Sequence, residues 1–330
     1  MSNRLHGRLD DPSGDAGYAD HPPRVGFFTD TSVCIGCKAC EVACKEWNAL
    51  PDPDPGPLRL SGDSYDNTGA LGASSWRHVA FIEQGPLDVG AAITADGLSP
   101  TDAGGPADGP GLAGGPADVL GPALASGMLA ASGAGPDGGL GSATRWLMAS
   151  DVCKHCTHAA CLDVCPTGAL VRTEFGTVIV QSDVCNGCAY CVSACPFGVI
   201  DRRPGDGRAW KCTMCYDRLR GGMEPACAKA CPTDSIQFGP LDELRVTAAA
   251  RVEELHASGV TDARLYGADP DDGIGGAGAF FLLLDQPEVY GLPPDPVVTT
   301  KDLPQMWKWA GGAAALLVAG VAAAFAGRRP

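Results

Sequence analysis

The spacing of its cysteines constrains this chain more than any other feature. Residues 153–166 read C-x2-C-x4-C-x3-C-P, and residues 185–196 read C-x2-C-x2-C-x3-C-P. The second spacing holds a [4Fe–4S] cluster on cysteine thiolates, and where two such runs occur together the fourth cysteine of each run ligates the neighbouring cluster. The sequence therefore predicts iron–sulfur clusters.

Two further runs flank this stretch, so that four groups of four account for all 16 cysteines. A loop, a short helix and a strand recur around the runs, which is the internal symmetry of a two-cluster ferredoxin, here present twice. We therefore expect an α+β fold of two pseudo-symmetric, two-cluster ferredoxin-like modules. The flanking runs are Cys34, Cys37, Cys40 and Cys44 on the N-terminal side, and Cys212, Cys215, Cys227 and Cys231 on the C-terminal side.

Two other uses of cysteine fit this pattern less well. Structural zinc sites also use C-x2-C pairs, but they usually join two pairs across a longer loop, whereas here a third cysteine follows within a few residues. Disulfide-dense domains are typically small and secreted, and no disulfide framework explains four repeats of one ligand spacing. Proline follows the last cysteine of three runs, as in the iron–sulfur spacing, at Pro166, Pro196 and Pro232.

The net charge of −15 argues against nucleic acid or an anionic membrane surface as the partner. Clusters on four thiolates add further negative charge. Several basic residues lie beside the cysteine runs, where they either offset that charge or are ordinary solvated side chains. They are Lys38, Lys45, Lys154, Arg172 and Lys211.

Composition divides the chain into segments. Residues 1–25 are polar, lack an apolar signal segment and a twin arginine, and predict a mobile tail. Residues 86–143 are mostly Gly, Ala, Pro, Asp and Ser, and such a segment cannot bury enough apolar surface to order itself. We expect a disordered insertion there, with a partner-binding arm as the alternative. The ferredoxin-like domain then comprises a first part, residues 26–85, and a four-cluster core, residues 144–240.

Local patterns predict several elements around the cysteines. Gly36 supplies the backbone freedom for the first ligand loop, and a short helix follows Cys40. Residues 76–83 alternate as in a strand, residues 169–180 form a hairpin that turns near Phe175 and Gly176, and S-I-Q-F forms a later strand. Residues 241–300 form a C-terminal packing segment, with a helix from Leu241 to about Gly259 and a buried strand over 279–284.

The last segment predicts one transmembrane helix, over residues 305–328. It is uncharged between Lys308 and Arg328, and as a helix it spans about 30 Å, enough for the hydrocarbon core of a bilayer. A buried helix of a soluble domain is the alternative. Arg328 and Arg329 favour a cytoplasmic C-terminus, which places the clusters outside, although Lys301 and Lys308 on the other flank weaken this asymmetry.

Four stretches carry a resemblance to a known family: C-I-G-C-K-A-C-E-V-A-C-K-E-W-N (34–48), C-K-H-C-T-H-A-A-C-L-D-V-C-P (153–166), C-N-G-C-A-Y-C-V-S-A-C-P-F-G (185–198), and W-K-C-T-M-C-Y-D-R with E-P-A-C-A-K-A-C-P-T (210–233). They resemble the iron–sulfur (beta) subunit of membrane-bound, molybdenum- or tungsten-dependent formate dehydrogenases. The likeness covers about residues 27–84 and 145–240, and a single C-terminal membrane helix fits it. The insertion at 86–143 is longer than the family needs.

The resemblance implies four [4Fe–4S] clusters, each held by three cysteines of one run and one of another. In nitrate-reductase-type relatives a Trp replaces the cysteine that matches Cys188 and makes that cluster [3Fe–4S], so Cys188 indicates four cubanes. His155 and His158 have no role in this pattern, and we expect them to be solvated or to lie behind the ligands. The implied sets are Cys34, Cys37, Cys40 and Cys231 (first set), Cys44, Cys212, Cys215 and Cys227 (second set), Cys153, Cys156, Cys161 and Cys195 (third set), and Cys165, Cys185, Cys188 and Cys191 (fourth set).

The resemblance also implies an electron-transfer subunit and not a catalyst. The residues agree with this expectation, because the sequence has no recognisable pterin site or acid–base constellation. Its expected donor is a molybdopterin (Mo or W) catalytic alpha subunit that oxidises formate, and its expected acceptor is a membrane cytochrome b or a polytopic quinone-reactive subunit. We expect export of the folded protein beside a signal-bearing partner. The alternatives are the same relay in a membrane-bound hydrogenase or a sulfur-compound reductase, and a freestanding polyferredoxin.

Overall fold

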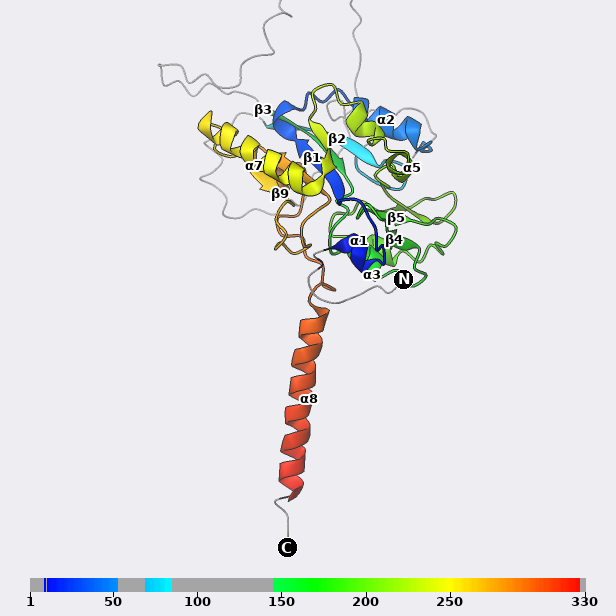
Figure 1. Ribbon diagram of the computed structural model, residues 1–330, viewed down its shortest axis with the longest axis vertical. Coiled ribbons are helices and arrows are strands. Elements are labelled where there is room, and N and C mark those ends of the chain that lie inside the picture. The colour runs from blue at the N-terminus through cyan, green and yellow to red at the C-terminus, as the bar shows by residue number, and fades with distance from the viewer. Residues whose placement is uncertain (1–8, 10, 53–68, 85–144, 327–330) are drawn as a thin grey trace, which may run out of the picture. The chain divides into compact units, whose positions relative to one another are not determined.

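The computed structural model describes residues 9, 11–52, 69–84 and 145–326. The predicted insertion at 86–143 lies outside the described residues, as do residues 1–8 and 10 of the predicted tail. The elements below belong almost entirely to one compact unit, formed by residues 1–82 together with 146–330. The fold is a mixture of short helices and small sheets (Figure 1).

A four-stranded sheet in the order β8-β1-β10-β9 forms the centre of this unit. β1 (Val25–Asp30) runs parallel to β10 (Ala279–Leu283) and antiparallel to β8 (Ile236–Pro240), and β9 (Arg264–Tyr266) forms the edge beyond β10. The two central strands are mostly apolar and almost fully buried, as expected for strands covered on both faces. The predicted strands at S-I-Q-F and 279–284 are confirmed, whereas the sequence does not predict β1 or its parallel pairing.

α7 (Leu241–Ala257) packs on this sheet through the face that the sequence predicts. Leu244, Ala248 and Leu255 are buried in one apolar cluster with Phe28 and Phe280, whose rings stack at 5.4 Å. The helix ends before Gly259, which has a φ of +93°. The predicted helix is therefore confirmed, and it stabilises the sheet on the side opposite the cysteines of the first and second sets.

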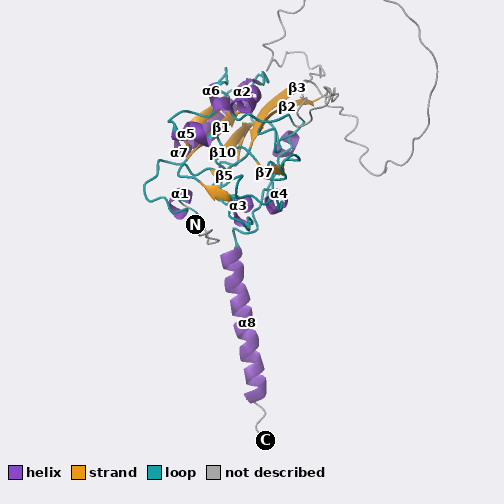
Figure 2. Ribbon diagram, turned by 90° about the vertical axis from the view of Figure 1, so that its right-hand side faces the viewer, coloured by secondary structure: helices purple, strands orange, loops and turns teal. Residues whose placement is uncertain are grey.

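Short elements carry the cysteines or join the loops that carry them (Figure 2). The predicted strand at 76–83 is found as β2 (Arg77–Gln84), paired with β3 (Arg145–Val152), and the predicted hairpin is found as antiparallel β4 (Leu170–Arg172) and β5 (Val178–Val180). The helix predicted after Cys40 is α2 (Ala39–Trp47). The remaining short elements are η1 (Thr31–Val33), α3 (Ala160–Asp163), α4 (Tyr190–Ala194), β6 (Asp201–Arg202), β7 (Ala209–Trp210), α5 (Tyr216–Arg220), α6 (Ala226–Lys229) and η3 (Pro287–Tyr290).

The segment before β1 differs from the mobile tail that the sequence predicts. Residues 12–15 form a short helix, α1 (Pro12–Asp15). The side chain of Asp11 caps it by accepting a hydrogen bond from the backbone N–H of Gly14. Ser13 is buried against the β4–β5 hairpin, and Arg24 donates to the hydroxyl of Thr157 at 2.7 Å. Ordered structure is therefore present from near Asp11, because these polar contacts replace the apolar packing that the composition lacks.

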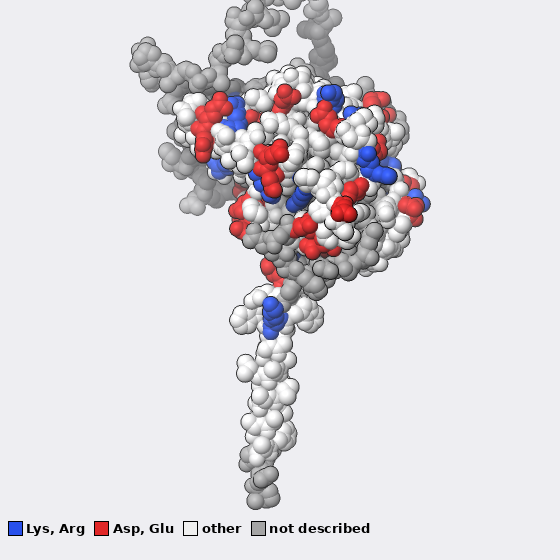
Figure 3. All heavy atoms as spheres, in the orientation of Figure 1, with Lys and Arg blue, Asp and Glu red and all other residues white. Residues whose placement is uncertain are grey.

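α8 (Leu303–Ala326) extends away from the rest of the unit (Figure 1). Residues 305–326 are long and apolar enough to cross a membrane, and none of this segment is buried within the chain. Its surface is almost entirely uncharged (Figure 3). The predicted C-terminal helix is therefore present, and it is a candidate membrane span.

Candidate metal centres

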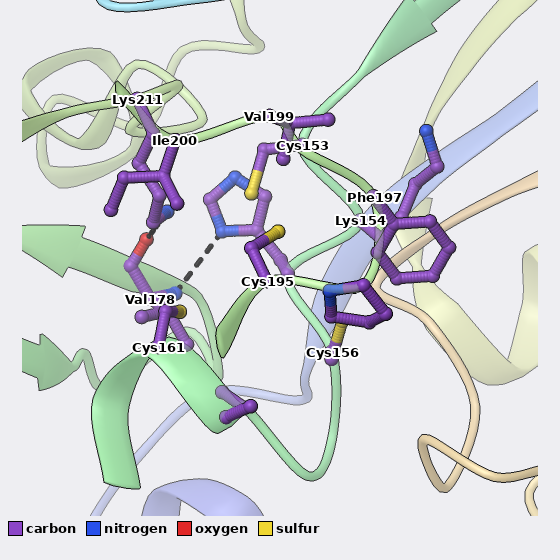
Figure 4. A pocket seen from close by; sticks show the side chains of 14 residues that line it. Cys153, Lys154, Cys156, Cys161, Val178, Cys195, Phe197, Val199, Ile200 and Lys211 are labelled. Carbon is purple, nitrogen blue, oxygen red and sulfur yellow. Dashed lines mark hydrogen bonds between the residues drawn. The ribbon is translucent and has the colours of Figure 1, made fainter. Parts of the chain in front are cut away.

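The four cysteines of the third set line one cavity (Figure 4). This cavity contains about 370 Å³ of space that no protein atom fills, and its remaining wall is mostly apolar. Among the residues that the structure describes, no three His, Cys, Asp or Glu side chains lie close enough to share a single metal ion. The cysteines instead surround a space large enough for a group of several atoms. They are Cys153, Cys156, Cys161 and Cys195.

Two arginines, Arg172 (buried) and Arg24 (half-buried), hold the loop that carries Cys153 and Cys156. Arg172 donates to the carbonyl oxygens of Cys156 at 3.2 Å and Thr157 at 2.6 Å. Arg24 donates to the carbonyl oxygen of His155 at 3.1 Å. These bonds satisfy carbonyl groups that a tight loop leaves without partners in regular secondary structure, and they fix the direction of the two cysteines.

The first set lines a second cavity, which contains Cys34, Cys37 and Cys40 from one run together with Cys231 from another. Gly36 has a φ of +64°, and a Cβ there would lie 2.6 Å from both Met148 Sδ and Phe81 Cζ. Glycine is therefore required for two reasons, the left-handed backbone and the close packing. The predicted role of Gly36 is confirmed.

The second and fourth sets are brought together in the same way, as their electrostatic interactions show. Burial and the thiolates of Cys212, Cys227 and Cys215 raise the pKa of Cys44 far above its ordinary value. Burial and the thiolates of Cys185, Cys165 and Cys188 raise the pKa of Cys191 to about 11. The cysteines of each set implied by the resemblance thus either line one cavity or lie close enough to shift the pKa of another member of the set.

All 16 cysteines lie in the described part of the chain, and all are free thiols. Seven are buried, seven are half-buried and two are exposed. Desolvation raises the pKa of Cys156, Cys161 and Cys212 far above that of an exposed thiol. Such groups become thiolates only beside positive charge. A bound metal supplies this charge, and its thiol ligands lose their protons as a result. Sulfur donors around buried cavities therefore fit [4Fe–4S] clusters.

Arg77 is a buried cation at the boundary between the first and second sets, and sequence reasoning missed it. Its side chain is 2% exposed and donates to Cys227 Sγ at 3.3 Å and to the hydroxyl of Ser150 at 3.1 Å. Burial lowers the pKa of Arg77, but the thiolates of Cys227 and Cys40 raise it by more, so that it lies above its ordinary value. Its position in a strand far from any cysteine run concealed this role.

Lys211 occupies a similar position between the second and third sets. It is 2% exposed, and its ammonium donates to the carbonyl oxygens of Val178 and Cys212. Burial lowers the pKa of Lys211, but the thiolates of Cys153, Cys161 and Cys212 raise it above its ordinary value. Of the two interpretations of this lysine, the structure supports the one in which it offsets cluster charge.

The other basic residues beside the cysteine runs differ among themselves. Lys154 is buried, pairs with Asp151, and lies over the rings of Phe197 and Phe281. Arg172 is buried against backbone carbonyls, as described above. Lys45 pairs with Asp52 at the surface. Only some of these residues are therefore solvated.

The two histidines of the second run are buried rather than solvated. His155 lines the third-set cavity, whereas His158 is packed against Gly275, outside the lining of that cavity. Burial lowers the pKa of both rings, and nearby cations lower it further. Both are therefore neutral side chains near neutral pH.

Neighbouring sets are also close enough to affect one another. Three thiolates raise the pKa of a cysteine in another set: Cys227 acts on Cys40, Cys153 on Cys212, and Cys191 on Cys161. These pairs join the first set to the second, the second to the third, and the third to the fourth. Each set is therefore close to the next one in this order.

The first and fourth sets each contain a cysteine that reaches the surface. Cys37 of the first set and Cys188 of the fourth set are exposed. Ile35 and Val42 are exposed apolar residues near Cys37 in the sequence, and Val184 and Tyr190 are exposed near Cys188. The first and fourth sets are thus more accessible from outside than the second and third.

The sequence is similar to several characterised proteins. The profile of the 4Fe-4S dicluster domain family matches residues 144–241. The nitrate-inducible formate dehydrogenase iron–sulfur subunit of Escherichia coli is 34% identical over 312 residues, which cover 93% of this chain and 84% of that protein. The formate dehydrogenase iron–sulfur subunit of Haemophilus influenzae is 34% identical over 84% of this chain and 72% of its own length. A component of the anaerobic dimethyl sulfoxide reductase of E. coli is 30% identical over 67% of this chain and 76% of its own length.

Proposed function

Because this protein belongs to the family of formate dehydrogenase iron–sulfur subunits, we propose that it relays electrons within a formate-oxidising complex. It is an electron-transfer subunit with a 4Fe-4S dicluster domain, and not the catalytic subunit. The observation that carries the proposal is the gathering of all 16 cysteines into four groups. We propose that these groups follow one another in a row, from the first set to the fourth.

Each set is proposed to hold one [4Fe–4S] cluster, which gives four in all. A bound cluster of this type accepts and releases one electron at a time. Two cavities support the ligand assignment of the first and third sets, and the mutual effects of the thiolates support that of the second and fourth. The assignment is Cys34, Cys37, Cys40 and Cys231; Cys44, Cys212, Cys215 and Cys227; Cys153, Cys156, Cys161 and Cys195; and Cys165, Cys185, Cys188 and Cys191.

The residues around the sets perform three tasks in this proposal. Apolar side chains such as Val178 and Ile200 exclude water from the third-set cavity. Arg77 and Lys211 offset negative charge between neighbouring sets. Backbone and side-chain donors hold individual thiolates: burial raises the pKa of Cys165, but the N–H of Leu170 and the hydroxyl of Thr167 lower it below its ordinary value.

The two modules are proposed to be related by pseudo-symmetry. Gly36 and Lys38 in the first run and Gly187 and Ala189 in the third all have positive φ, between +58° and +73°. His155 in the second run and Met214 in the fourth also have positive φ, +43° and +56°, and each lies between two cysteines of a C-x2-C pair. Equal backbone conformations at equal positions in paired runs support a duplicated ligand loop. The domain boundaries proposed for this arrangement remain 26–85 and 144–240, with a packing segment over 241–300.

The fourth-set end of the row is proposed to face the membrane partner. Thr300, three residues before α8, donates to Asp163 Oδ2 at 2.5 Å, and Asp163 lies in α3 between Cys161 and Cys165. The ammonium of Lys301 donates to the carbonyl oxygen of Asp272. The candidate membrane helix is thus attached beside the third and fourth sets. We propose that a membrane cytochrome b or a polytopic quinone-reactive subunit docks at this end.

The first-set end is then proposed to face a molybdopterin (Mo or W) catalytic subunit. Exposed Cys37, Ile35 and Val42 provide an accessible, partly apolar surface there. α8 anchors the protein through one span, with Trp307 and Trp309 exposed near its start, where they suit a membrane interface. We propose that the cluster domain lies on the extracytoplasmic side and is exported beside a signal-bearing partner.

Visible absorption tests this proposal on the tagged complex, purified without oxygen in detergent. Bleaching of the broad cluster absorption on addition of formate is the expected result. Bleaching by dithionite, but not by formate, with a molybdopterin subunit present would contradict formate as the donor. Metal analysis that finds zinc and no iron would contradict the iron–sulfur assignment itself.

A sulfur-compound reductase is the second candidate, because a component of an anaerobic dimethyl sulfoxide reductase is also similar. That similarity covers 67% of this chain, whereas the formate dehydrogenase relative from E. coli covers 93%. The same preparation distinguishes the two candidates. Reoxidation of the dithionite-reduced complex by dimethyl sulfoxide, without reduction by formate, is the outcome that favours the second.

A further inference from the structure

His155 is held in one position inside the ligand loop of the third set. It lies between Cys153 and Cys156 and has a φ of +43°, a backbone conformation that residues other than glycine rarely adopt. Its carbonyl oxygen accepts hydrogen bonds from the N–H of Gly278 at 3.3 Å and from Arg24 at 3.1 Å. The side chain is 2% exposed. The backbone therefore aims the ring at a defined place.

One hydrogen bond determines which ring nitrogen carries the proton. The backbone N–H of Val178 donates to His155 Nδ1 at 3.1 Å, and Figure 4 marks this bond at Val178. A backbone N–H has no lone pair to offer, so Nδ1 must be the acceptor and cannot bear a proton. A ring whose Nδ1 accepts a hydrogen bond is the neutral imidazole, which carries one N–H group. The single proton of the ring is consequently on Nε2.

This Nε2–H group is buried and has no hydrogen-bond partner among the described residues. A buried donor without an acceptor is destabilising, so a structure that retains one needs a specific reason. The ring lines the same cavity as the four cysteines of the third set. The remaining lining is apolar or already bonded, as for the ammonium of Lys211, which donates to two carbonyl oxygens.

We propose that His155 Nε2 donates a hydrogen bond to a sulfur atom of the cluster held by the third set, and thereby raises its reduction potential. The inference rests on the proposed ligand assignment of that set. A cluster gains one negative charge on reduction, and a hydrogen bond to sulfur stabilises the reduced state more than the oxidised state. His155 is thus a positioning and tuning residue and not a fifth ligand.

The corresponding residue of the second set supports this assignment. Met214 lies between Cys212 and Cys215, as His155 lies between Cys153 and Cys156, and it has a φ of +56° and is fully buried. Methionine carries no side-chain N–H, so the loop itself does not require a donor at this position. The histidine therefore distinguishes the third set from the second, and the protein itself provides a substitution that the loop accommodates.

Redox titration of the intact, anaerobically purified complex, followed by electron paramagnetic resonance, tests the proposal. Iron and acid-labile sulfide are counted first, so that failure of the four-cluster assignment is recognised separately. In His155→Met, one couple is expected to shift to lower potential while the others stay in place. His155→Gln retains a donor and an acceptor, so the reduction potential of that couple is expected to stay close to that of the unaltered complex. His158→Gln is the matched control, and its couples should equal those of the unaltered complex.

A second measurement does not depend on the His155 variants assembling. The complex is prepared with ¹⁵N-labelled histidine, reduced, and studied by pulsed electron paramagnetic resonance. We expect a nitrogen coupling at one cluster, and we expect the His158→Gln complex to show the same coupling. Absence of any such coupling overturns the proposal, as do unchanged potentials in a His155→Met complex of normal iron content. A shift of equal size in His158→Gln also overturns it, since the effect would then be structural.

Discussion

The guanidinium of Arg77 lies 3.3 Å from Cys227 Sγ, although 150 residues separate the two in the sequence. The same side chain donates to Ser150, whose hydroxyl lies 3.2 Å from Cys40 Sγ. Cys40 belongs to the first set and Cys227 to the second. One buried cation thus connects ligands of two neighbouring sets, and its charge acts on both.

Replacing Arg77 by glutamine is expected to lower the reduction potentials of the first and second clusters together. A hydrogen bond to a charged group contributes about 1.5–3 kcal/mol, which for one electron corresponds to roughly 60–130 mV. Redox titration measures the shift. Arg220→Gln, which removes an exposed arginine from the neighbouring helix α5, is the control. A shift confined to one couple would contradict the shared position of Arg77.

Replacing Lys211 by methionine is expected to lower the potentials of the second and third clusters. The substitution removes a buried positive charge and leaves the carbonyl oxygens of Val178 and Cys212 without this donor, so the free energy of unfolding should also fall by about 1–3 kcal/mol. Lys229→Met removes a lysine whose side chain is 72% exposed and should change neither quantity. If the two potentials remained unchanged in a folded Lys211→Met complex, the charge would have no electrostatic role.

Gly36→Ala is expected to destabilise the first ligand loop and to reduce iron content by about four atoms per chain, one cubane. The added Cβ meets Met148 and Phe81 at 2.6 Å and forces a residue with a side chain into positive φ. Gly222→Ala is the matched control, because Gly222 has a φ of +69° with open space around it. It should keep its iron and lose only the backbone contribution, about 1–2 kcal/mol. Iron analysis and thermal unfolding measure the two effects, and equal losses in both variants would exclude crowding as the cause.

Deleting residues 303–330 is expected to release the protein, expressed without its partners, from the membrane fraction while its iron content stays the same. The reason is that residues 305–326 are long enough to span a bilayer and contribute no buried side chains to the cluster-bearing unit. Fractionation after carbonate washing measures the release. A truncated protein that remains in membranes would show that another surface binds them.

Protease access to a C-terminal tag in intact cells tests the proposed orientation in the assembled complex. The positive residues Arg328 and Arg329 favour a cytoplasmic end, so the tag is expected to be protected until the membrane is opened. Cleavage in intact cells would place the cluster domain on the cytoplasmic side. A tag on a known cytoplasmic protein serves as the control for membrane integrity.

Much of the site follows from the sequence because ligand spacing is a local property. Three cysteines within a few residues, with a glycine such as Gly36 or Gly187 among them, predict a loop around a metal group. This prediction does not depend on the rest of the fold. The short helix after Cys40, the β4–β5 hairpin and α7 follow from equally local patterns. The apolar segment at the C-terminus predicts α8 in the same manner.

Tertiary structure alone decided the features that depend on distant parts of the chain. β1 pairs in parallel with β10 across some 250 residues, and no local pattern specifies such a partner. Arg77 and Lys211 become buried cations only because separate cysteine runs pack around them, and a basic residue in sequence looks the same whether it ends in solvent or between thiolates. The position of the proton on the ring of His155 depends on Val178, which lies in strand β5. The sequence by itself thus determined which chemistry the protein carries, and the packing of distant segments determined how charge and hydrogen bonds are distributed around it.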